Sequence, residues 1–172
     1  METPLEAVLM NSYKEGMLQF IEDNPVAFNE LVQLSFTDNQ PYAWRATWLL
    51  GTVMEDNDSR LLKYIQPMIE FISICKKDGQ QRDLLRILSR MNLDDEMEGL
   101  YFDTCVSLWE QIGKIPSVRY TALKGIVEIA KKYPEMVDEV KLLTQDHYLD
   151  ELSPGVKHSA KRMMKELEKA VG

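Results

Sequence analysis

The stretch Trp44-Arg45-Ala46-Thr47-Trp48-Leu49 decides the fold, because its outline recurs along the chain. In each copy a long cationic side chain stands near the expected start of a helix, and an apolar side chain follows three positions later. Successive copies are separated by about 37 residues, which is within the range of helical repeats, so a repeated helix-pair unit is predicted. The cationic positions are Arg45, Arg82, Arg119 and Lys157, and the apolar positions are Trp48, Leu85, Ala122 and Ala160.

Helix-start signals divide the chain into about nine segments with helical character. Prolines stand where helices can begin, as in Asn24-Pro25 and Ser153-Pro154, because their missing N–H would have no intrahelical partner there. Pro67 is expected to break or bend the fourth segment. No segment alternates with the period of a half-buried strand. The segments cover approximately 4–22, 25–36, 41–55, 59–76, 79–91, 95–112, 116–132, 134–147 and 154–170.

The expected helix over 95–112 is apolar around most of its circumference. Only a narrow wedge, formed by Gly99, Asp103, Ser107 and Glu110, is polar. A helix packed on one side needs an apolar arc of about 100°. The wider arc indicates neighbours on two sides, as inner units of a solenoid have. The sequence therefore predicts an all-α fold, an α-solenoid of antiparallel helix pairs with a right-handed superhelix, in a single domain over residues 1–172.

The recurring arginine and the helix-turn-helix period resemble HEAT repeats, whose first helix often carries such an arginine. The resemblance covers the chain from about residue 41 onward, with residues 4–36 as a divergent first pair. The fourth copy departs from the pattern because Lys157 replaces the arginine. HEAT, armadillo or a looser relative all remain open as the class of repeat. The resemblance implies an architecture and no particular activity.

Composition disfavours several classes of partner. The chain has 172 residues, of which 45% are hydrophobic, and a net charge of −8. An acidic chain is poorly suited to duplex nucleic acid or to anionic membranes. No apolar run approaches the roughly 20 residues that span a bilayer, and the N-terminus lacks the features of a secretory signal. Cys75 and Cys105 lie in apolar stretches, so buried thiols and a reducing, cytoplasmic location are expected.

Three groups of residues have both a functional and a structural interpretation. Arg45, Arg82 and Arg119 could form an anion-binding ladder, but a fixed repeat position favours capping of carbonyls or pairing with acidic groups in the adjacent turn. Trp44 and Trp48 share a helix face and could form an aromatic platform. Core packing is favoured for them, because Leu49, Leu50 and Val53 extend the same apolar surface. His147 and Glu151 provide too few ligands for a zinc site, so a solvated turn is expected.

Other catalytic and cofactor signatures are missing from the sequence. It contains neither a phosphate-binding loop nor a Gly-x-Ser-x-Gly or His-Glu-x-x-His motif. No catalytic residue, metal ligand or cofactor is therefore assigned, and a non-catalytic role is favoured.

The second helix of each expected pair is predicted to line the inner surface of the solenoid. Asp94, Asp95, Glu96, Glu98 and Asp103 follow one another there with no intervening base. Such a run favours a helix N-terminus and a solvated face, or else an acidic groove for a basic peptide. The predicted partner-binding residues are Lys63, Glu70, Asp103, Glu110, Asp138 and Lys141.

The predicted function is a non-catalytic scaffold that binds a protein or peptide, with its oligomeric state left open. The alternative is a DNA-binding enzyme resembling the HEAT-like alkylpurine DNA glycosylases, for which Trp44, Trp48 and Trp109 would supply aromatic side chains. The acidic groove-side helices oppose that alternative. A positive patch would favour it, if one assembled from Arg60, Lys63, Arg82 and Arg86.

Overall fold

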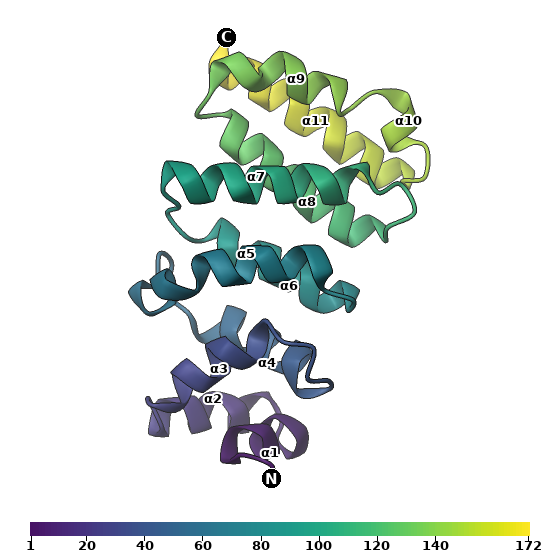
Figure 1. Ribbon diagram of the computed structural model, residues 1–172. Helices are drawn as coiled ribbons and strands as arrows, with labels where there is room; N and C mark the ends of the chain where they lie inside the picture. Colours follow the sequence, from purple (N-terminus) through teal and green to yellow (C-terminus); the bar gives the residue numbers. More distant parts are fainter. The chain divides into compact units, whose positions relative to one another are not determined.

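The chain folds into helices joined by short turns, and the computed structural model describes residues 1–172 (Figure 1). The predicted all-α class is confirmed. The α-helices are α1 (Pro4–Asn11), α2 (Lys14–Asp23), α3 (Ala27–Ser35), α4 (Tyr42–Val53), α5 (Ile65–Ile74), α6 (Asp78–Ser89), α7 (Asp95–Glu110), α8 (Pro116–Ala130), α9 (Val137–Leu142), α10 (Asp146–Leu149) and α11 (Pro154–Val171). The 3-10 helices are η1 (Ser59–Tyr64) and η2 (Pro134–Met136).

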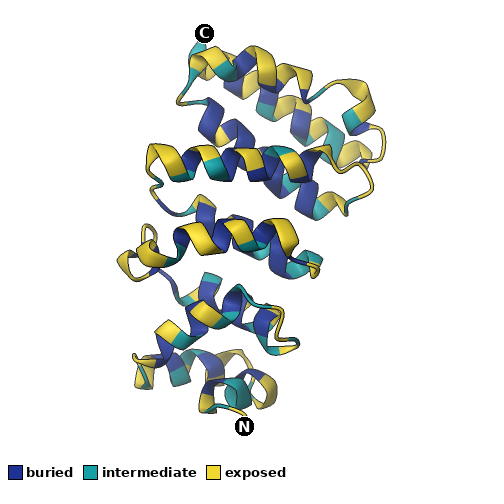
Figure 2. Ribbon diagram, in the orientation of Figure 1, coloured by how far each residue is buried: buried dark blue, intermediate teal, exposed yellow.

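The helices group into two compact units, Met1–Asn92 and Leu93–Gly172, each described by itself. In the first unit, α3 packs along α4, α5 packs on α6, and α4 contacts α6. In the second unit, α7 packs along α8, and α11 contacts both α8 and α9. Figure 2 shows buried residues on the facing sides of these helices and exposed residues on their outer sides. Each unit therefore builds its core between paired helices, as a solenoid requires.

The repeated cationic position falls at nearly the same place in four helices. It is the fourth residue of α4, α8 and α11 and the fifth residue of α6. The resemblance suggested that the first helix of a pair carries this residue. In the pairs that pack together, α3 with α4, α5 with α6 and α7 with α8, the second helix carries it.

Several predicted helices are divided in the structure, so eleven α-helices and two 3-10 helices replace the expected nine. The segment over 4–22 breaks at Ser12 and Tyr13, whose backbones are extended. Asn11 and Ser12 are weak helix formers because their side chains compete for backbone hydrogen bonds. The segment over 59–76 changes from η1 to α5 at Ile65, which places Pro67 in the first turn of α5.

Side-chain caps fix several of the helix starts. Thr3 and Glu6 form a reciprocal capping box on α1. Asp94 caps α7, because it accepts from the Met97 N–H at 2.9 Å. These contacts satisfy backbone N–H groups that have no partner within the helix.

Helix α7 has the wide buried arc that its sequence predicts. Gly99, Asp103, Ser107 and Glu110 are exposed, and most of the remaining circumference is buried. Both cysteines are buried, as expected. Burial raises the pKa of the Cys105 thiol to about 12, so this thiol stays protonated at neutral pH.

Asp58 is expected to make the free energy of unfolding fall at acid pH. Hydrogen bonds from Arg60, followed by one from the Glu55 N–H, lower the pKa of Asp58 from 3.8 to about 2. A lowered folded-state pKa contributes stability that is present above pH 3.8 and lost as the pH falls towards 2. We expect urea unfolding at pH 7, 4 and 2.5 to show a smaller fall in the free energy of unfolding for Asp58→Asn than for the unaltered chain. Asp56→Asn, which removes an 83% exposed carboxylate, should keep the slope of the unaltered chain.

Candidate protein-binding site

The arginines at the repeat position hold the structure together. Arg119 is fully buried, and it donates from Nε to the Trp109 carbonyl at 2.9 Å and from Nη2 to the Tyr148 carbonyl at 2.6 Å. Arg45 donates from Nη1 to the Leu9 carbonyl at 3.0 Å. Arg82 pairs with Asp83 at 3.1 Å. The interpretation of the arginines as donors to carbonyls is confirmed for Arg45 and Arg119. Arg82 instead pairs with the next residue of its own helix and not with an acid in an adjacent turn.

The prediction that Trp44 and Trp48 pack in the core is wrong. Each side chain is 37% exposed. The buried face of α4 consists mainly of small residues, including Ala43, Ala46 and Thr47. Small side chains let neighbouring helices approach closely, so the two indoles remain at the rim of the packed surface. Trp109 differs, because it is fully buried and donates from Nε1 to the Leu143 carbonyl at 2.6 Å.

The six predicted partner-binding residues are all exposed, and they are divided between the two compact units. Lys63 and Glu70 belong to the first unit, and the other four belong to α7 and α9 of the second. Lys141 is engaged by Asp138 at 3.6 Å and Glu168 at 3.5 Å. Asp103 is the one of the four in the second unit that lines a hollow with other carboxylates.

That hollow, called here the acidic hollow, lies among α7, α8, η2 and α9. Its volume is about 510 Å³. Phe102, Ile129 and Met136 give it an apolar lining, and Gly99 adds no side chain. The carboxylates that line it are Asp95, Glu98, Asp103 and Glu139, together with the hydroxyl group of Tyr133.

Glu98 is the unusual member of this set, because its side chain is only 7% exposed. Its Oε2 accepts from Lys132 Nζ at 3.1 Å. Its Oε1 is buried and has no hydrogen-bond partner. A buried carboxylate oxygen without a donor is costly, so the acidic hollow contains an unsatisfied acceptor.

The acidic hollow has a negative electrostatic field. Glu98 is the largest cause of a raised pKa at the Tyr133 hydroxyl, followed by burial and by Asp95. Lys132 opposes this effect only in part. A cationic group entering the hollow would therefore gain favourable charge interactions.

Sequence reasoning found part of this hollow and missed the rest. Asp103 was predicted, and the acidic run that contains Asp95 and Glu98 was noted. Ile129, Met136 and Glu139 were not, because they come from segments that only the fold brings to α7. Glu110 lies farther along α7 and accepts from the Tyr148 hydroxyl at 3.4 Å.

The four cations that would favour nucleic acid have different surroundings in the structure. Arg60 pairs with Asp58 at 2.7 Å and lies 3.6 Å from the centre of the Phe28 ring. Lys63 lines a hollow with Arg60, whereas Arg82 and Arg86 both contact Asp83 on α6. No group of three or more His, Cys, Asp or Glu side chains is arranged to hold a metal ion. No helix is long and apolar enough to cross a membrane.

Comparison with known families identifies the repeat. A family model described as a HEAT repeat domain matches residues 1–167. The chain belongs to the HEAT-repeat family. The match includes the first helices, so the divergent pair over residues 4–36 is part of the same HEAT repeat domain. No curated protein and no solved structure matches the chain. Membership explains the arginine positions of this HEAT repeat domain and supports a helical scaffold of the kind used for protein interactions.

Proposed function

We propose that this chain is a non-catalytic protein-binding module whose acidic hollow holds a basic segment of a partner. The observation that carries the proposal is Glu98, a buried carboxylate with one oxygen lacking a donor. The charge of Glu98 attracts an arginine side chain, whose five N–H donors can then reach the exposed carboxylates of the hollow.

The surroundings of Glu98 favour a protein segment over a free ion. Phe102 and Ile129 are buried residues at the edge of the acidic hollow, and Met136 is half-buried beside them. Such a lining accommodates the methylene chain of arginine or lysine or a neighbouring apolar side chain. Three exposed carboxylates, Asp95, Asp103 and Glu139, provide the charge that attracts further basic residues.

A defined peptide tests this proposal. The basic peptide is acetyl-Ala-Arg-Leu-Arg-Ala-amide, and the acidic peptide is acetyl-Ala-Glu-Leu-Glu-Ala-amide. Titrated into ¹⁵N-labelled protein, the basic peptide should shift the amide signals of α7, η2 and α9. Asp103→Lys should raise its Kd at least about tenfold, which corresponds to losing about 1.4 kcal/mol of binding free energy.

Glu110→Lys is the matched control, because it makes the same charge change on α7 outside the acidic hollow. Its Kd should change by less than about twofold, apart from the general effect of net charge. Equal weakening by both reversals would show that net charge attracts the peptide without a defined site. Unchanged binding by Asp103→Lys would rule out the acidic hollow as the site.

The alternative of a DNA-binding enzyme rests only on the resemblance and its aromatic residues, and it stays a prediction. A gel shift with duplex DNA at low salt tests it. Retardation that weakens steeply with added salt would favour it, since phosphate contacts release counterions. The absence of any retardation would eliminate it.

A further inference from the structure

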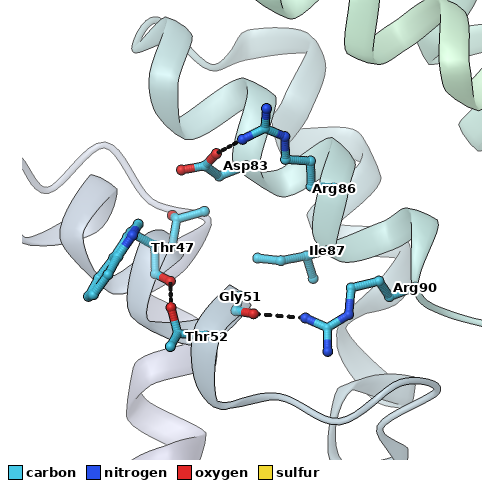
Figure 3. Close-up of a pocket in the computed structure, with 8 residues that line it drawn as sticks. Thr47, Gly51, Thr52, Asp83, Arg86, Ile87 and Arg90 are labelled. Carbon is cyan, nitrogen blue, oxygen red and sulfur yellow. Dashed lines mark hydrogen bonds and ion pairs between the residues drawn. The ribbon is translucent and has the colours of Figure 1, made fainter. Parts of the chain in front are cut away.

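A second hollow lies between α4 and α6 of the first unit, beside the exposed tryptophans (Figure 3). Its volume is about 280 Å³. Figure 3 shows Ile87 pointing into the space between Gly51 and the two arginines Arg86 and Arg90. We call this the tryptophan hollow; it is lined by Thr47, Trp48, Gly51, Thr52, Asp83, Arg86, Ile87 and Arg90.

Trp48 gives this hollow an apolar wall. Trp48 lines it, and Trp44 lies one turn earlier on α4. Their 37% exposure leaves large aromatic surfaces in water that the core of α4 does not use. Tryptophan and arginine are enriched at the residues that dominate protein–protein binding. The tryptophan hollow combines both residue types.

The arginines here carry more positive charge than the nearby carboxylates neutralise. Asp83 is shared by Arg82 at 3.1 Å and Arg86 at 3.4 Å, so one carboxylate faces two guanidinium groups. Arg90 is held by Asp56 at 2.7 Å and by the Gly51 carbonyl at 2.7 Å. Arg86 differs from Arg90, because its side chain is 61% exposed and its one contact is long. Most of its five N–H donors are therefore open to a ligand.

We propose that the tryptophan hollow docks an acidic segment of a protein that also carries a large apolar side chain. The apolar side chain packs against Trp48, and an adjacent carboxylate accepts from Arg86. The charges in the hollow favour an acidic occupant. A cation would be repelled by Arg86 and Arg90, and Asp83 is already paired with arginines. This surface is separate from the acidic hollow and has the opposite preference, so either proposal can fail without the other.

The two defined peptides distinguish the surfaces in one set of titrations. The acidic peptide should shift amide signals of α4 and α6 and alter tryptophan fluorescence, because Trp44 and Trp48 are exposed whereas Trp109 is buried. Replacing its leucine by serine should weaken binding, since the apolar side chain would lose its contact with Trp48. Arg86→Gln and Trp48→Gln should each raise the Kd at least about tenfold.

Arg162→Gln is the matched control, because Arg162 on α11 is also 61% exposed and also contacts one acid. It should leave the acidic-peptide Kd unchanged. Arg86 is exposed, so its variant should fold even if Trp48→Gln does not, and circular dichroism checks both. Unchanged binding by Arg86→Gln, equal binding of the basic peptide at α4 and α6, or tighter binding of an oligothymidylate there would overturn the proposal.

Discussion

Arg119→Ala should destabilise the chain by about 3–5 kcal/mol, because it leaves two buried carbonyls without donors at roughly 1–3 kcal/mol each and opens a cavity. The two carbonyls belong to Trp109 and Tyr148. The guanidinium also lies 4.5 Å from the centre of the Trp109 ring, a contact that alanine removes. Urea unfolding followed by circular dichroism measures the loss.

Two variants separate the causes of this effect. Arg45→Ala alters the same repeat position where the arginine is half-buried and makes one such bond, so a smaller loss of about 1–2 kcal/mol is expected. Arg119→Met keeps most of the volume but none of the donors, and it should recover only part of the stability. Full recovery by methionine would mean that the hydrogen bonds contribute little.

The large effect expected for Arg119 comes from its buried position, because Arg45 at the same repeat position is only half-buried. Burial lowers the pKa of Arg119 relative to a solvated guanidinium, with Glu151 opposing the effect, which shows that the charge is held in a poorly solvating site. Hydrogen bonds to carbonyls from α7 and from α10 offset part of that cost. Arg119 thus connects three helices of the second unit.

Gly125→Val should cost about 3 kcal/mol, because α7 and α8 approach too closely at this point for a branched side chain. A Cβ at residue 125 would lie 2.9 Å from Cys105 Sγ and 2.9 Å from the Tyr101 hydroxyl oxygen. Both groups are buried and cannot move aside easily. The midpoint of urea unfolding reports the change.

Gly99→Val is the control for helix propensity. Nothing lies within 4 Å of a Cβ built at Gly99, which is exposed on α7. Its stability should stay within about 0.5 kcal/mol of the unaltered chain. Combining Gly125→Ala with Cys105→Ala should cost less than the sum of the two single changes, because the smaller residue makes room for the new Cβ. Strict additivity would contradict a direct clash.

The repeat was predicted well from the sequence, because similar residues recur in it at a nearly constant spacing. The spacing of Arg45, Arg82 and Arg119 and the wide apolar arc of 95–112 follow from units that pack against like neighbours. Helix ends were predicted less well, as at Ser12, where two weak helix formers interrupt an otherwise helical pattern. Such breaks depend on small differences in backbone energy that apolar periodicity does not record.

Trp44 and Trp48 show where sequence reasoning fails. Their spacing marks one face of α4, but it cannot tell whether that face or the neighbouring one of Ala43 and Ala46 is buried. The structure buries the face with the small residues, because small side chains let α4 and its neighbouring helices approach more closely. Side-chain size alone predicted that the indoles would be buried, but in the tertiary structure they lie at the surface.

The sequence by itself determined an all-α fold of repeated helix pairs, because that follows from a constant local period. It implied HEAT-type repeats only through a resemblance, and the recurring spacing favoured a structural role for the arginines. Only the tertiary structure decided which carboxylates share a hollow. Asp95 and Glu98 lie on α7, whereas Glu139 lies on α9, so their proximity depends on how α7, α8 and α9 pack. The buried, unpaired oxygen of Glu98 likewise results from contacts between helices, and a sequence pattern does not record such contacts.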